Sequence, residues 1–199
     1  MQPTIKTLEA YYNEMWDSAV SRFEKGEFAT DPDIDAPYDN RRGIILVAHP
    51  PKQIRDKVMQ MLLDFQQENP GQYYYPETDL HITIFSVVTC FAGFNPDSDL
   101  KKAYISSIKE VLKNSSPFKI HFRGITAAPG CVIIRGFPVD KGLEAIRNSL
   151  YHHFEAAGIF YKPDNRHKNS NGTLHGNTIQ KDYGKPRRIY GKTISLSKY

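Results

Sequence analysis

The sequence predicts an α+β protein in which helices flank antiparallel or mixed sheets. Two patterns predict this class: several segments carry apolar residues at spacings of three and four, and several short apolar runs end at glycine or proline. Helices that alternate with hairpin-like strands are typical of such folds. The 199 residues, 40% apolar and 24% charged, have the composition of a globular protein with room for one domain or two small lobes.

The N-terminal part is predicted to be a helix followed by an irregular connection. The apolar side chains of residues 5–25 form one stripe, and Gly26 ends the helix. Prolines and aspartates in the stretch 28–43 indicate an exposed connection without regular structure. We therefore divide the chain into an N-terminal helix with its connection, residues 1–40, and a single domain over residues 41–199.

Strands and helices alternate in the first half of that domain. The continuous apolar run 43–49 predicts a buried strand, and residues 52–69 follow as a helix that starts after Pro51. A strand around His81 comes next. It is followed by a helix over residues 97–114, opened by an aspartate or serine as N-cap.

The second half of the domain contains a pair of strands and a further helix. Residues 118–128 and 131–138 predict hairpin-like strands, and residues 139–158 predict a helix with Gly158 just beyond its C-terminus. A final strand is expected within residues 188–199. The order after the N-terminal helix is then β-α-β-α-β-β-α-β-β.

Charge and cysteine content narrow the function classes. The net charge of +4 is a mild basic bias that is compatible with a phosphate-bearing ligand, and the basic excess after residue 180 is typical of a solvated face. Cys90 and Cys131 lack CxxC spacing, which argues against zinc binding and thiol catalysis. The chain opens without an apolar signal core and has no run long enough to span a membrane. We therefore expect a cytoplasmic protein without a membrane partner.

Two of the seven histidines belong to similar short motifs. His81 and Thr83 lie two positions apart in "LHITI", so on a strand their side chains point the same way. The second motif, "LHGNTI", places His175 94 positions later (175 minus 81). A lone strand histidine is more often structural, and this interpretation is favoured for His49 and His121. Two imidazoles on opposite sides of a phosphorus, however, can act together as base and acid.

The paired motifs resemble the two His-x-Thr/Ser signatures of the 2H phosphoesterase superfamily, which includes RNA 2′,5′-ligase-like proteins and 2′,3′-cyclic nucleotide phosphodiesterases. The resemblance covers residues 42–179. It implies a bilobal fold of two pseudo-symmetric lobes, each an antiparallel or mixed sheet with flanking helices, around a shared cleft. It also implies cleavage, or reverse ligation, of a 2′,3′-cyclic or 2′-5′ phosphodiester without a metal or cofactor. The expected partner is an RNA end or a nucleotide, and we expect a monomer.

Carried over residue by residue, the resemblance makes His81 and His175 the acid–base pair. Thr83 and Thr178 would hold the non-bridging phosphate oxygens. The second motif departs from the family pattern by one extra residue, which on a regular strand would turn Thr178 away from His175. Either a bulge at Gly176–Asn177 restores its direction, or the Asn177 side chain replaces the hydroxyl. The candidates for neutralising phosphate charge are Lys181, Arg135 and Arg123.

Two further interpretations stay open. One is a catalytically silent RNA- or nucleotide-binding module of the same fold, in which Tyr183 and Tyr190 of the basic tail stack on bases. The other is a structural or partner-binding protein in which both histidines are satisfied core residues. The motifs do not distinguish among RNA ends, cyclic nucleotides, oligoadenylates and smaller cyclic phosphates as the substrate.

Overall fold

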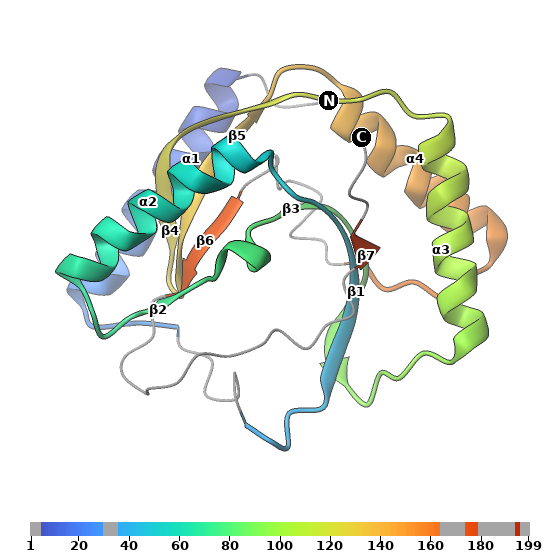
Figure 1. The fold of residues 1–199 in the computed structure, drawn as a ribbon, viewed down its shortest axis with the longest axis horizontal. Coiled ribbons are helices and arrows are strands. Elements are labelled where there is room, and N and C mark those ends of the chain that lie inside the picture. The colour runs from blue at the N-terminus through green and yellow to red at the C-terminus, as the bar shows by residue number, and fades with distance from the viewer. Residues whose placement is uncertain (1–4, 30–35, 164–173, 179–193, 196–199) are drawn as a thin grey trace.

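A computed structural model describes residues 5–29, 36–163, 174–178 and 194–195 of the 199-residue chain. It is an α+β fold in which one mainly antiparallel sheet is flanked by helices (Figure 1). The strand order is β4-β5-β6-β3-β1-β7, with β2 paired to β6. The predicted α+β class and the antiparallel pairing are therefore confirmed.

The elements follow the predicted order closely. A two-residue strand and one turn of 3₁₀ helix before His81 are additions, and the strand of the first motif begins one residue after His81. The bounds are α1 Ile5–Glu24, β1 Arg41–Ala48, α2 Lys52–Glu68, β2 Tyr73–Tyr74, η1 Glu77–Asp79, β3 Ile82–Ala92, α3 Ser98–Lys113, β4 Ile120–Ala128, β5 Cys131–Pro138, α4 Gly142–Ala157, β6 Leu174–Thr178 and β7 Ile194–Ser195.

Local side-chain chemistry accounts for the helix ends. The Asp97 carboxylate accepts hydrogen bonds from the backbone N–H groups of Asp99 and Leu100, at 3.0 and 2.8 Å, and so caps the first turn of α3. At the end of α4, Gly158 has φ 60°, the left-handed conformation that glycine adopts at lowest cost. Both caps agree with the sequence prediction.

The sheet consists of two halves that barely touch. We call β3, β1 and β7 the first half-sheet, and β4, β5, β6 and β2 the second half-sheet. Within the described residues, a single antiparallel pair, Ile82 with Leu174, joins β3 of the first to β6 of the second. The two motif strands are thus neighbours at the junction of the halves and separate beyond it.

The two faces of the sheet are covered by different helices. α2, α3 and α4 bury one face in the main core, whose central members include Leu46, Leu80, Val87, Tyr104, Ile108, Leu143, Leu150 and Phe154. α1 covers the other face of the β4–β5 hairpin. There the Tyr12 hydroxyl donates to the Gly136 carbonyl at 2.8 Å, and the Thr126 hydroxyl donates to the Tyr12 carbonyl at 2.7 Å. In Figure 1, α2 passes in front of the second half-sheet and α1 lies behind it.

The helices are amphipathic or polar rather than apolar throughout. Each covers the sheet with one face and exposes charged side chains on the other. Among the helices of the described residues, none combines the length and the apolar character needed to cross a bilayer.

Candidate functional site

His81 lies directly before the first residue of β3, and its ring orientation is fixed by the backbone. The ring Nδ1 is 2.7 Å from the Asp79 carbonyl oxygen. A carbonyl only accepts hydrogen bonds, so Nδ1 carries the hydrogen and the neutral ring keeps its lone pair on Nε2. The half-buried position lowers the pKa of His81 by desolvation, while the Asp79 carbonyl acts in the opposite direction. His81 is therefore neutral at pH 7, with one nitrogen free to take a proton.

Thr83 shares the strand parity of His81. The register pairs Val47 with Thr83 and Ala48 with Ile82, without an irregularity between the two pairs. Thr83 is buried, and β3 carries one extra residue, Ile84, directly after it. This bulge bends the strand next to the first motif, a common device beside functional sites.

A cation from α4 holds this bulge. The Arg147 guanidinium donates to the carbonyl oxygens of Thr83 at 2.9 Å and Ile84 at 2.7 Å. Burial lowers the pKa of Arg147 to about 10, so the side chain is still charged at neutral pH. Arg147 is not among the site residues predicted from the sequence. The sequence does contain one indication of its role: Arg147 lies four positions after Leu143, on the apolar stripe of α4. Burying a guanidinium there costs free energy of desolvation unless hydrogen-bond acceptors compensate it.

The second motif lies on β6, and the backbone register of this strand shows whether a bulge is present at Gly176. β6 pairs Asn177 with Val132 and His175 with Ile133, so Gly176 is an extra residue opposite β5. Position 178 pairs with Cys131, which has the same parity on β5 as Ile133. The predicted bulge at Gly176 is thereby confirmed, and positions 175 and 178 regain a common parity. Position 177 has the other parity, and a phosphate contact of Asn177 stays a prediction.

The two motifs meet at the junction of the half-sheets. Ile82 lies opposite Leu174 in an antiparallel pair, so one further step in the same register sets position 81 opposite position 175. Neighbouring strands lie about 4.8 Å apart, which brings the two histidine positions within reach of one phosphate group. Motifs separated by most of the domain in sequence are therefore neighbours in the sheet.

Arg123 and Arg135, the two arginines that the sequence suggested for neutralising phosphate charge, contact α1. Arg123 pairs with Glu9, and its guanidinium lies 5.0 Å from the centre of the Phe137 ring. Arg135 donates to Asn13 Oδ1 at 3.2 Å and lies over the ring of Tyr12. These contacts fix α1 on the hairpin, and a role of either cation in phosphate binding stays a prediction. Lys181, Tyr183 and Tyr190 lie outside the described residues.

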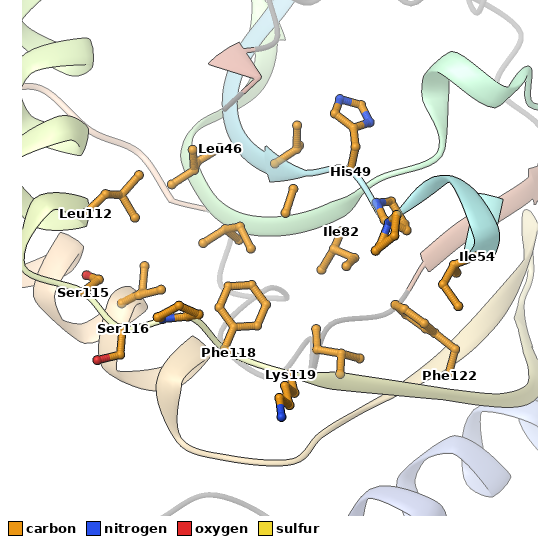
Figure 2. A pocket seen from close by; sticks show the side chains of 18 of the residues that line it. Leu46, His49, Ile54, Ile82, Leu112, Ser115, Ser116, Phe118, Lys119 and Phe122 are labelled. Carbon is orange, nitrogen blue, oxygen red and sulfur yellow. The ribbon is translucent and has the colours of Figure 1, made fainter. Parts of the chain in front are cut away.

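An apolar cavity of about 610 Å³ opens beside the first half-sheet. Leu46 and Ile82 form one wall, and they are faced by Phe118 from the segment leading into β4 and by Phe122 from β4 itself (Figure 2). In that view Lys119 points away from the centre of the cavity. On β3 the cavity is lined by Ile82, which has the opposite parity to His81 and Thr83, and on β1 the lining includes His49.

Comparisons with known proteins bear on the fold. No family model and no curated protein matches this sequence. A solved structure, the crystal structure of TT0787 from Thermus thermophilus, is similar over 72% of this chain and 76% of that chain. The TM-score is 0.51 and the sequence identity is 16%. At this identity the likeness concerns the fold alone, over the aligned parts of the two chains.

Proposed function

We propose that this protein is a metal-independent phosphodiesterase that acts on a 2′,3′-cyclic or 2′-5′ phosphodiester of RNA or a nucleotide. The observation that carries the proposal is the register that sets positions 81 and 175 opposite one another across β3 and β6. Two imidazoles from two half-sheets at one junction are the arrangement that a bilobal two-histidine phosphoesterase requires. We accordingly interpret the half-sheets as its two lobes.

The protonation of His81 suits the role of base in hydrolysis. Its Nε2 lone pair takes the proton of the attacking water, whose oxygen forms a bond to phosphorus. The bond from phosphorus to the 2′ or 3′ oxygen breaks, and the His175 imidazolium donates a proton to that oxygen. The product is a phosphate monoester next to a free hydroxyl. In the ligation direction the two histidines exchange roles.

The remaining residues stabilise the charge that develops on phosphorus. In this proposal the Thr83 and Thr178 hydroxyls donate to the non-bridging oxygens, as the shared parity of each motif allows. Arg147 holds the carbonyl groups of Thr83 and Ile84 and adds a positive charge close to the first motif. It thereby fixes the strand from which His81 and Thr83 act.

The proposal is tested by turnover in the presence of EDTA. The purified protein is incubated with the four nucleoside 2′,3′-cyclic phosphates and with a 2′-5′-linked dinucleotide, and the products are identified by ³¹P NMR. We expect hydrolysis by the wild type and by His152→Ala, an exposed histidine of α4 that serves as the matched control. We expect loss of hydrolysis in His81→Ala and His175→Ala.

Each other outcome has a definite meaning. Absence of turnover by the wild type on every substrate contradicts the phosphodiesterase proposal. Turnover that survives both histidine substitutions contradicts the assignment of the residues. Binding of a 2′-nucleotide without turnover supports the silent binding module instead.

A further inference from the structure

A third histidine, His49, lies next to the two motif histidines in the sheet, on the strand that pairs with the other side of β3. β1 and β3 pair Val47 with Thr83 and Ala48 with Ile82, and one further step sets His49 opposite His81. His81 is therefore the middle position of a row that crosses three strands, with position 175 on one side and His49 on the other.

The contacts of His49 fix its ring as they fix that of His81. Nδ1 of His49 is 3.0 Å from the carbonyl oxygen of Leu80, so Nδ1 carries the hydrogen and Nε2 is the free nitrogen. The residue is exposed. His49 also lines the apolar cavity, and Figure 2 shows its ring on the far side of the β1 ribbon from Phe118. The register with β3 gives His49 the parity of His81 and Thr83.

The spacing of the row suggests what His49 would contact. A phosphorus held midway between positions 81 and 175 lies one and a half strand spacings, about 7 Å, from His49. In an RNA end with a 2′,3′-cyclic phosphate, a second phosphate is attached through the 5′ oxygen of the same ribose. A free nucleoside 2′,3′-cyclic phosphate lacks that group. A cation at His49 would therefore distinguish an RNA end from a cyclic mononucleotide.

We propose that His49 is a specificity-determining residue that binds the phosphate on the 5′ side of the terminal ribose, so that the enzyme prefers RNA ends to cyclic mononucleotides. This inference rests on the proposed function of His81 and His175. Because the neutral ring presents only a lone pair at Nε2, His49 binds the second phosphate after taking up a proton. The preference therefore increases as the pH is lowered.

The charged side chains of α2 next to His49 are paired with carboxylates. On α2, Arg55 pairs with Glu77 at 2.9 Å and Lys52 pairs with Asp56 at 2.7 Å. On the β3 side the neighbouring titratable group is His81, with the Asp79 carboxylate beyond it. Both α2 cations are thus compensated by carboxylates, and the second phosphate supplies the negative charge that stabilises the His49 imidazolium.

The test compares matched substrates between pH 5.5 and 8. kcat/KM is measured for adenosine 2′,3′-cyclic phosphate, for the same compound with a 5′-phosphate, and for ApA with a terminal 2′,3′-cyclic phosphate. A charge-assisted hydrogen bond corresponds to about a tenfold preference at pH 6. We expect this preference for both phosphate-bearing substrates in the wild type, with a decline toward pH 8. A preference for ApA alone, absent with the 5′-phosphorylated mononucleotide, would overturn the inference because it indicates contacts with the second nucleoside.

Two variants separate recognition from a structural role. His49→Asn can keep the hydrogen bond to the Leu80 carbonyl without a charge, and we expect its preference to fall to within about twofold of unity. His49→Arg has a permanent charge, and we expect it to keep a preference that no longer changes with pH. A wild-type ratio near one, an unchanged ratio in His49→Asn, or a ratio in His49→Arg that still follows pH would each overturn the inference.

A binding measurement distinguishes failure of this inference from failure of the proposed function. Calorimetric titration with adenosine 2′-phosphate and adenosine 2′,5′-bisphosphate requires no turnover. A tenfold tighter binding of the bisphosphate, lost in His49→Asn, supports the role of His49 even in a protein that hydrolyses nothing. Equal affinities for the two ligands overturn it, even if cyclic phosphates are hydrolysed.

Discussion

The two half-sheets present related motifs with different supports. In the first, His81 is held by a backbone carbonyl, and the strand behind it is fixed by two hydrogen bonds from Arg147. In the second, a five-residue strand is held between β5 and β3 by its register, with one extra residue at Gly176. In the first half-sheet, burial and a side-chain anchor fix the proposed base, His81. In the second half-sheet, backbone pairing with β5 places positions 175 and 178 on the same face of β6.

The largest expected effects come from removing either histidine. His81→Asn and His175→Asn should each lower kcat/KM by roughly 10² to 10⁴, because general acid and general base catalysis have that magnitude. The double variant should lose little more than the worse single variant, since the two groups act together in the same chemical step. Steady-state kinetics with a cyclic phosphate checks this. Losses that multiply in full would show that the two histidines act independently.

Removing the anchor of the first half-sheet should affect both stability and activity. Arg147→Met leaves the carbonyl groups of Thr83 and Ile84 without their charged donor and should lower the free energy of unfolding by about 1.5 to 3 kcal/mol. The matched control is Arg123→Met, whose exposed ion pair with Glu9 should contribute about 1 kcal/mol or less. Urea unfolding followed by circular dichroism measures both values. Equal losses in the two variants would contradict the anchoring role.

The pKa of His81 predicts how stability depends on pH. Burial lowers the pKa of the folded form below the ordinary value of 6.5, so between the two pKa values the unfolded chain binds more protons. The stabilising contribution of neutral His81 is present above pH 6.5 and is lost as the pH falls toward the folded-state value. Urea unfolding of the wild type and of His81→Asn at several pH values between 5 and 8 should show a shallower slope in the variant. An identical slope would show that His81 is not desolvated.

The smallest effect is expected from shortening the second motif. Deletion of Gly176 converts His175-Gly176-Asn177-Thr178 into a regular His-x-Thr sequence and keeps positions 175 and 178 on one parity. Activity should stay within about tenfold of the wild type, a smaller loss than general acid–base catalysis would cause. Kinetics with the same cyclic phosphate measures this, and a loss as large as that of His175→Asn would contradict the bulge.

The sequence predicted the elements that have a long periodic pattern. The four α-helices of the described residues were identified, together with the cap at Asp97 and the glycine that ends α4, because periodicity and capping are local properties. The two-residue β2 and the 3₁₀ turn at Glu77–Asp79 were missed, since elements of that length have no period to detect.

The parts of the site that depend on pairing between distant strands were not predictable. Whether Gly176 forms a bulge depends on its register with β5, and whether His49 joins His81 depends on the register of β1 with β3. In the sequence, Arg147 is one cation in an apolar stripe. Its role as an anchor becomes visible only from its hydrogen bonds to the carbonyl groups of Thr83 and Ile84 on β3. Sequence patterns describe single strands, whereas the site is a property of neighbouring ones.

The central claim is that His81 and His175 form one phosphate site. Titration of ¹⁵N-histidine-labelled protein with adenosine 2′-phosphate, followed by NMR of the imidazole nitrogens, tests it most directly. We expect the signals of His81 and His175 to shift together with one dissociation constant, while that of the exposed His121 stays unchanged. A shift of only one of the two histidines, or two different dissociation constants, would contradict it.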